Sequence, residues 1–127
     1  MNAHLPALGL PVLDPRCITD LGEELESLPG ALDFLSSYLE LLPDRLGAIS
    51  AAVRAADGDA AMDRALSLKV TSTMVGAVQL AALAEALEPP VRGGDWLTLD
   101  AMLHVLAPAA AAVRKAGAAV VNGLLHP

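Results

Sequence analysis

The sequence predicts an all-α protein, an up-and-down antiparallel four-helix bundle with a short N-terminal helix. Its 127 residues suffice for one hydrophobic core without staples. Only 2% of the residues are aromatic and the chain is rich in Ala and Leu, which favours helices over strands. Apolar residues recur in steps of three and four between short turns, so a closed bundle is the simplest core. Residues 1–13 are expected to form an irregular N-terminal arm, and residues 14–127 a single bundle domain.

The short first helix is expected to begin at Asp14-Pro15. Asp14 can cap a helix, and Pro15 suits its first position. Pro29-Gly30 is expected to end this helix. The apolar residues that follow the cap at helical spacing are Ile18, Leu21, Leu25 and Leu28.

The second segment carries one long apolar stripe, made of Leu32, Leu35, Leu39, Leu42, Leu46, Ile49 and Val53. Pro43 lies inside it and removes one backbone hydrogen bond, at a cost of about 3 kcal/mol if nothing relieves it. Because the stripe keeps its phase across Pro43, we expect a kink and not a break. Gly58 suits the left-handed position after this helix and Asp59 the N-cap of the next, which predicts a tight turn.

The third segment and the last helix complete the predicted bundle. The third places Leu68, Ser72, Gly76, Leu80, Leu83 and Leu87 on one stripe. It meets the proline pair at 89–90, which cannot continue it. Its small residues Ser72 and Gly76 predict a close approach by a neighbouring helix. Asp95 can cap the last helix, which is expected to kink or divide near Pro108. The inward residues of that helix are expected to be Leu99, Met102 or Leu103, Leu106, Val113 and Val120.

Composition argues against several classes of ligand and location. A net charge of −7 disfavours nucleic acid and anionic membrane surfaces, because both attract clustered Lys and Arg. The apolar stretches are interrupted by charged residues or proline, so none is expected to span a membrane. Cys17 is alone, so no intrachain disulfide can form, and the N-terminus lacks the pattern of a secretion signal. We therefore expect a cytoplasmic protein with a buried or half-buried thiol.

The third segment also contains an ordered motif. It reads Ala65-Leu66-Ser67-Leu68-Lys69-Val70-Thr71-Ser72 and is followed by Gly76-Ala77 and Leu87-Glu88. The motif resembles the signature of histidine-containing phosphotransfer (HPt) domains, in which Ala-His-x-Leu-Lys-Gly-Ser-Ser precedes a Gly-Ala pair, spaced leucines and a closing Leu-Glu. The resemblance runs from about residue 21 to about residue 106. It implies a four-helix bundle whose partners are response-regulator receiver domains or sensor kinases.

Two residues depart from this signature, and both departures affect its chemistry. Leu66 occupies the position of the phosphorylated histidine, and Val70 that of the glycine one turn later. A phosphorelay needs an imidazole nitrogen that attacks an aspartyl phosphate, and leucine has no lone pair to offer. The resemblance therefore predicts a pseudo-phosphotransfer module of a two-component system, not an enzyme, that docks a partner without carrying phosphate.

The docking surface is expected to consist of Leu66, Lys69, Val70 and Thr73. These residues share one helical stripe, displaced by about a third of a turn from the core stripe, and so should lie at or near the surface. In an HPt domain, as the resemblance implies, the glycine leaves room for the partner and the lysine supports the phosphoryl charge. An alternative is that the Leu66/Val70 face serves a homodimer, since exposed apolar residues on a helix are a usual sign of self-association.

Few other residues offer chemistry. His104, on the last predicted helix, is an alternative phosphoryl acceptor, but no Lys-Gly or Lys-Ser sequence accompanies it. His4 and His126 lie near the ends of the chain. Cys17 and the three histidines are scattered, whereas a zinc site needs three or four convergent ligands. We therefore expect no metal and no other cofactor. Trp96 is expected to staple the start of the last helix to the bundle.

Overall fold

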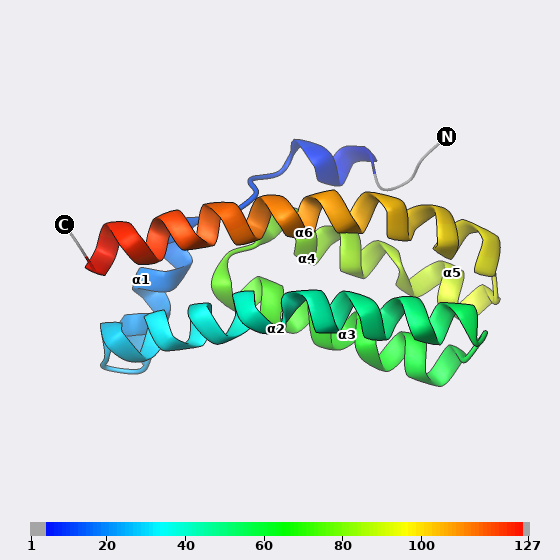
Figure 1. Cartoon of the computed structure of the whole chain (residues 1–127), viewed down its shortest axis with the longest axis horizontal. Helices are drawn as coiled ribbons and strands as arrows, with labels where there is room; N and C mark the ends of the chain where they lie inside the picture. Colours follow the sequence, from blue (N-terminus) through cyan, green and yellow to red (C-terminus); the bar gives the residue numbers. More distant parts are fainter. Residues whose placement is uncertain (1–4, 126–127) are drawn as a thin grey trace.

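The computed structural model describes residues 5–125, and every regular element in that range is helical (Figure 1). The elements are the 3₁₀ turn η1 (Leu5–Gly9), then α1 (Pro15–Glu24), α2 (Leu28–Arg54), α3 (Gly58–Val75), α4 (Val78–Ala86), α5 (Glu88–Gly93) and α6 (Trp96–Leu125). The bundle consists of α2, α3, the consecutive pair α4 and α5, and α6, which run alternately in opposite directions. The short α1 lies at one end. The predicted all-α bundle is confirmed.

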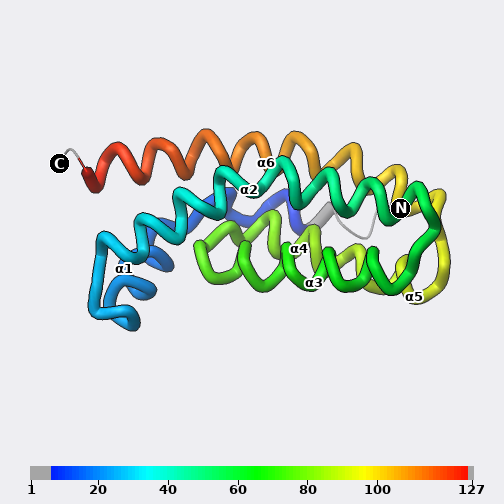
Figure 2. Tube along the Cα trace, turned by 60° about the horizontal axis from the view of Figure 1, so that its bottom comes forward, coloured from blue at the N-terminus to red at the C-terminus, as the bar shows by residue number. Residues whose placement is uncertain are grey.

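The four parts of the bundle enclose one core. Helix α2 packs on α3 and α6, and α4 packs on the same two helices from the other side (Figure 2). Burying a large aliphatic side chain contributes about 1.5–3 kcal/mol, so these contacts are the main source of stability. The largest fully buried side chains are Ile18, Leu35, Leu42, Ile49, Leu68, Val75, Leu80, Leu83, Leu87, Leu99, Leu106 and Val113. All except Val75 lie on the apolar stripes predicted from the sequence.

The boundary between α1 and α2 differs from the prediction. Helix α1 ends before Leu25, and the Ser27 hydroxyl caps α2 by accepting a hydrogen bond from the Gly30 backbone N–H at 2.9 Å. Pro29 and Gly30 therefore open α2 and do not close α1. Proline is tolerated there because the first N–H groups of a helix have no intrahelical partner. As a result, Leu25 and Leu28 are exposed and do not extend the core stripe.

The predicted tight turn between α2 and α3 is present but begins two residues earlier than expected. Ala56, and not Gly58, has a positive φ of 52°. Asp57, and not Asp59, caps α3 by accepting a hydrogen bond from the Ala60 backbone N–H at 3.1 Å. Gly58 is then the first residue of α3. Both aspartates are competent caps by residue type, so composition could not choose between them.

The predicted third helix is divided at Gly76. Helix α3 ends at Val75, and Gly76 takes the left-handed conformation with φ 82°. A Cβ at this position would lie 2.5 Å from the Asp14 backbone oxygen, so the close neighbour is the start of α1. The Asp14 N–H also donates to the Gly76 carbonyl at 2.8 Å. Glycine is favoured at such a helix end because it has no side chain to oppose a positive φ.

The two internal prolines do not divide their helices. Helix α2 is continuous across Pro43 and α6 across Pro108. By length and composition α6 could cross a membrane, since an 18-residue window has a mean hydropathy of 1.5. However, 33% of that window is buried in the bundle, where Leu99, Leu106 and Val113 are fully enclosed. Part of the apolar surface of α6 thus lies in the core, and the absence of a membrane partner stays a prediction.

The N-terminal segment is tied to α4. The Gln79 side chain donates to the Leu8 carbonyl at 3.1 Å, and the Gln79 backbone N–H donates to the Pro11 carbonyl at 2.9 Å. Ala7, in η1, is buried in the core. The segment that was expected to be irregular thus contains a 3₁₀ turn packed on the bundle. His4 and His126 lie outside the described residues.

Candidate functional site

The four predicted docking residues lie on the outer side of α3. Leu66 is 38% exposed and Val70 54% exposed, Thr73 is also exposed, and Lys69 is half-buried. Leu68, on the inner side, is fully buried. This distribution follows from the helical period, which separates the two stripes of α3 around its axis. The stripe is therefore accessible to a partner.

A shallow groove extends this surface toward α4. It has a volume of about 470 Å³ and is mainly apolar. Met74, one turn beyond Val70, is 41% exposed and lies in the groove. Sequence reasoning missed Met74, although its spacing of four from Val70 was a usable signal. The groove is lined by Leu10, Lys69, Val70, Thr73, Met74, Val78, Ala81, Ala82 and Glu85. We call this the α3–α4 groove.

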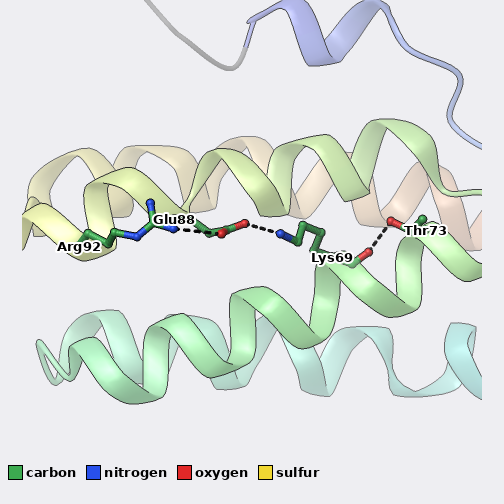
Figure 3. A network of polar contacts seen from close by, with 4 residues as sticks. All are labelled: Lys69, Thr73, Glu88 and Arg92. Carbon is green, nitrogen blue, oxygen red and sulfur yellow. Dashed lines mark hydrogen bonds and ion pairs between the residues drawn. The ribbon is translucent and has the colours of Figure 1, made fainter.

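Lys69 is held in an ion pair (Figure 3). Its Nζ lies 2.9 Å from Oε2 of Glu88, the first residue of α5, and Glu88 is buried. Arg92, one turn along α5, approaches the other carboxylate oxygen at 3.4 Å. The Lys69 backbone carbonyl accepts a hydrogen bond from the Thr73 hydroxyl at 2.7 Å. Lys69, which was expected on the docking surface, is therefore already paired within the bundle. Glu88, known from the sequence only as the end of the motif, and Arg92 join it at the site.

On the inner side, α3 is fastened to α2 by a buried hydrogen bond. The Tyr38 and Ser72 hydroxyls are 2.7 Å apart. Burial raises the pKa of Tyr38 to about 12, although the hydrogen bond to Ser72 acts in the opposite direction. The phenol is thus neutral at physiological pH, when it can donate a hydrogen bond. Ser72, predicted as a small residue at a close helix approach, is fully buried here.

A second pocket lies on the other flank of Leu66, between α2 and α3. Its volume is about 290 Å³, and its lining residues are Leu41, Asp44, Arg45, Ala48, Arg64 and Ser67. The Arg45 guanidinium donates through Nη1 to the Ser67 hydroxyl at 2.7 Å. Leu41 is 46% exposed. Apolar surface is therefore available on both α2 and α3.

The other sequence candidates lie elsewhere. His104 is exposed on α6, in a pocket shared with α2 residues that include Leu46 and Arg54. The structure does not bring it to the α3–α4 groove. Cys17 is half-buried, and burial raises the pKa of its thiol. Trp96 is partly buried against the core at the start of α6. Among residues 5–125, no three His, Cys, Asp or Glu residues are grouped as metal ligands.

The exposed stripe of α3 has no phosphoryl-acceptor atom at its centre. Leucine carries no nucleophile, so residue 66 itself cannot take a phosphoryl group. The exposed side chains of Leu66, Val70 and Met74 instead offer apolar surface, which favours association with a matching apolar surface.

The up-and-down bundle and the motif on α3 together define a helical module of the phosphotransfer type. The model of the Hpt domain family matches residues 33–116, which include the whole of α3, and the chain belongs to this family. The crystal structure of histidine-containing phosphotransfer protein B (HptB) from Pseudomonas aeruginosa PAO1 is similar, with a TM-score of 0.79 and 28% identity. The match covers 88% of this chain and 96% of that chain. No curated protein matches the sequence.

These comparisons confirm the fold and the family inferred from the α3 motif. The chain is a phosphorelay-type signalling module. Domains of this family are phosphotransfer carriers that interact with receiver domains and kinases, and they are generally soluble.

Proposed function

We propose that this chain docks a receiver domain or a sensor kinase of a two-component pathway without carrying phosphate. It would act there as a competitor, scaffold or inhibitor. The observation that carries the proposal is the exposed side chain of Leu66, the residue that the α3 motif aligns with the phosphorylated histidine of the resembling signature. Such a role implies a cytoplasmic location and requires no cofactor.

The chemistry of the surface supports docking without transfer. A phosphoryl acceptor must present a nucleophile in line with the aspartyl phosphate, so the residue at position 66 would be the one that meets it. Here that residue is aliphatic, and Val70 adds a branched side chain where the family has glycine. Leu66 and Val70 therefore present an apolar surface in place of a reactive side chain. Burial of that surface against a partner can still contribute binding free energy.

Charge reversal of the apolar contact is the direct test. The receiver domains and sensor kinases of the source genome would be titrated with the wild type and with Leu66→Arg by calorimetry. We expect Leu66→Arg to weaken binding by about tenfold or more, because a buried unpaired cation is costly. Leu97→Arg is the matched control. Leu97 is 83% exposed at the start of α6, so this substitution should leave the affinity for the partner unchanged.

Two results would end this proposal. One is a wild type that binds none of these receivers and kinases. The other is Leu66→Arg binding as well as the wild type and leaving pathway output unaltered. Circular dichroism of both variants establishes that the bundle is intact, so that a loss of binding reports on the surface.

Self-association through the same face is a second candidate function. Leu66, Val70 and Met74 form exposed apolar surface on one helix, and such surface is a common feature of dimers. Sedimentation equilibrium distinguishes the two: a stable dimer that Leu66→Glu dissociates supports this alternative, and a wild-type monomer at high concentration contradicts it.

A further inference from the structure

We propose that the pocket between α2 and α3 receives an acidic side chain of the docked partner, which Arg45 and Arg64 hold. This inference rests on the proposed function and names the chemistry of the partner surface that meets the chain. It concerns the flank of α3 that faces α2, whereas the ion pair of Lys69 lies on the other flank, toward α5.

The pocket adjoins the exposed stripe of α3. Ser67, which follows Leu66 in the chain, lines the pocket, and Arg64 lies one turn before Ser67 on the same side of α3. Helix α2, which packs beside α3 (Figure 2), contributes Leu41 and Arg45 to the lining. A partner that covers Leu66 would therefore also reach this pocket.

The two guanidinium groups of the pocket are not neutralised by carboxylates. Three ion pairs occur among residues 5–125, and none of them includes Arg45 or Arg64. The exposed Arg64 donates to the Ala60 carbonyl of its own helix at the long distance of 3.3 Å. Both positive charges thus remain available to an anion that enters the pocket.

Arg45 is held in place for such a contact. Its Nη1 donates to the Ser67 hydroxyl at 2.7 Å, which fixes the guanidinium where α2 meets α3. Its Nε is enclosed and has no hydrogen-bond partner within the described part of the chain. A buried donor without an acceptor costs about 1–3 kcal/mol, so an acceptor oxygen supplied by a partner would be favourable here. The planar fork of a guanidinium matches the two oxygens of a carboxylate.

The lining of the pocket favours an acidic side chain over a neutral or basic one. It carries two arginines and one acid, Asp44, so the pocket is locally positive in a chain whose net charge is −7. Leu41 and Ala48 provide apolar surface against which the carbon atoms of a glutamate or aspartate can pack. The volume of about 290 Å³ suits one or two side chains of a partner and is small for a cofactor.

Charge substitutions of opposite sign inside the pocket test the inference. Calorimetry would use a receiver domain or sensor kinase of the source genome that binds the wild type. We expect Arg64→Gln to weaken binding by about fivefold and Arg64→Glu by about tenfold or more, because the partner's carboxylate loses its counter-charge. Asp44→Asn should strengthen binding by about twofold, because it removes a repelling charge. Arg64 and Asp44 are both exposed, so these substitutions should leave the bundle intact.

Arg54 provides the matched control for these charge changes. It is exposed on α2 but lines the pocket on the α6 side, so Arg54→Gln should leave the affinity unchanged. Arg45 is followed without substitution, because its contact with Ser67 also joins α2 to α3. In NMR spectra of the arginine side chains, the Nε–H signal of Arg45 should shift when the partner is added, and that of Arg54 should not.

The outcomes separate this inference from the proposed function. Wild-type binding that Leu66→Arg weakens, but that Arg64→Glu affects no more than Arg54→Gln does, overturns the inference and leaves the docking role standing. Weaker binding by Asp44→Asn, or an Arg45 signal that does not shift in the complex, also overturns the inference. A wild type that binds none of these receivers and kinases overturns the docking role and, with it, the acidic contact.

Discussion

The hydroxyls of Tyr38 and Ser72 meet at 2.7 Å inside the bundle and join the first half of α2 to the last turns of α3. The two residues are 34 positions apart in the chain. Ser72 lies on the inner side of the helix whose outer side carries Leu66 and Val70. This hydrogen bond therefore helps to set the orientation of the candidate docking surface.

Removing either hydroxyl should destabilise the protein. We expect Tyr38→Phe and Ser72→Ala each to lower the free energy of unfolding by about 1 kcal/mol, because each leaves a buried hydroxyl without its partner. The double variant should lose less than the sum of the two, since the second substitution removes the group left unpaired. Urea denaturation measures all three, and strictly additive losses would contradict a shared hydrogen bond.

Tyr38 should also make stability sensitive to alkaline pH. Its pKa is raised to about 12 in the folded protein, whereas an unfolded tyrosine titrates near 10. Because the folded pKa is the higher one, its contribution is fully present below about pH 10 and is lost as the pH rises toward 12. The sequence contains one Tyr, so tyrosinate absorbance reports this residue alone. A folded-state transition near pH 10 would contradict the buried environment.

Gly76 should not accept a side chain. Gly76→Ala places a Cβ 2.5 Å from the Asp14 oxygen at φ 82°, so we expect a loss of about 2 kcal/mol or more in thermal or urea unfolding. Gly47→Ala is the control within α2, because a Cβ there meets nothing within 4 Å. Alanine favours a helix interior, so this variant should gain about 0.5–1 kcal/mol. Equal stability of the two variants would contradict the close approach of Asp14 to Gly76.

Placing a histidine at position 66 tests whether α3 can serve as a phosphotransfer scaffold. Leu66→His should accept phosphate weakly from a phosphorylated receiver, because Val70 still obstructs the approach. Adding Val70→Gly should increase labelling, since the reacting atoms can then come closer together. Acid-labile phosphate on the protein is the measurement. If neither variant is labelled, the docking surface has also diverged from that of a carrier.

The core could be predicted because burial follows the helical period. Leu35, Leu68 and Leu106 lie at steps of three or four from other apolar residues, and each faces inward. Helix ends were harder, because local signals compete: Asp57 and Asp59 can both cap a helix. The residue at which α2 ends decides which aspartate caps α3, and that end depends on tertiary packing.

The sequence predicted only part of the candidate site, because the helical period predicts exposure but not contacts between elements. The helical period indicated that Leu66 and Val70 would be exposed, and they are. It gave no indication that Lys69 would pair with Glu88, which lies 19 residues further along the chain on another element. A contact of that kind depends on how α3 and α5 pack against each other. The spacing of residues along the sequence does not reveal that packing.

The most direct measurement follows a radiolabelled phosphoryl group. A phosphorylated receiver that binds this chain would be incubated with the wild type, and both proteins recovered and counted. We expect a complex that carries no label on this chain, because Leu66 offers no acceptor atom. Acid-labile label on this chain, for instance at His104, would contradict it.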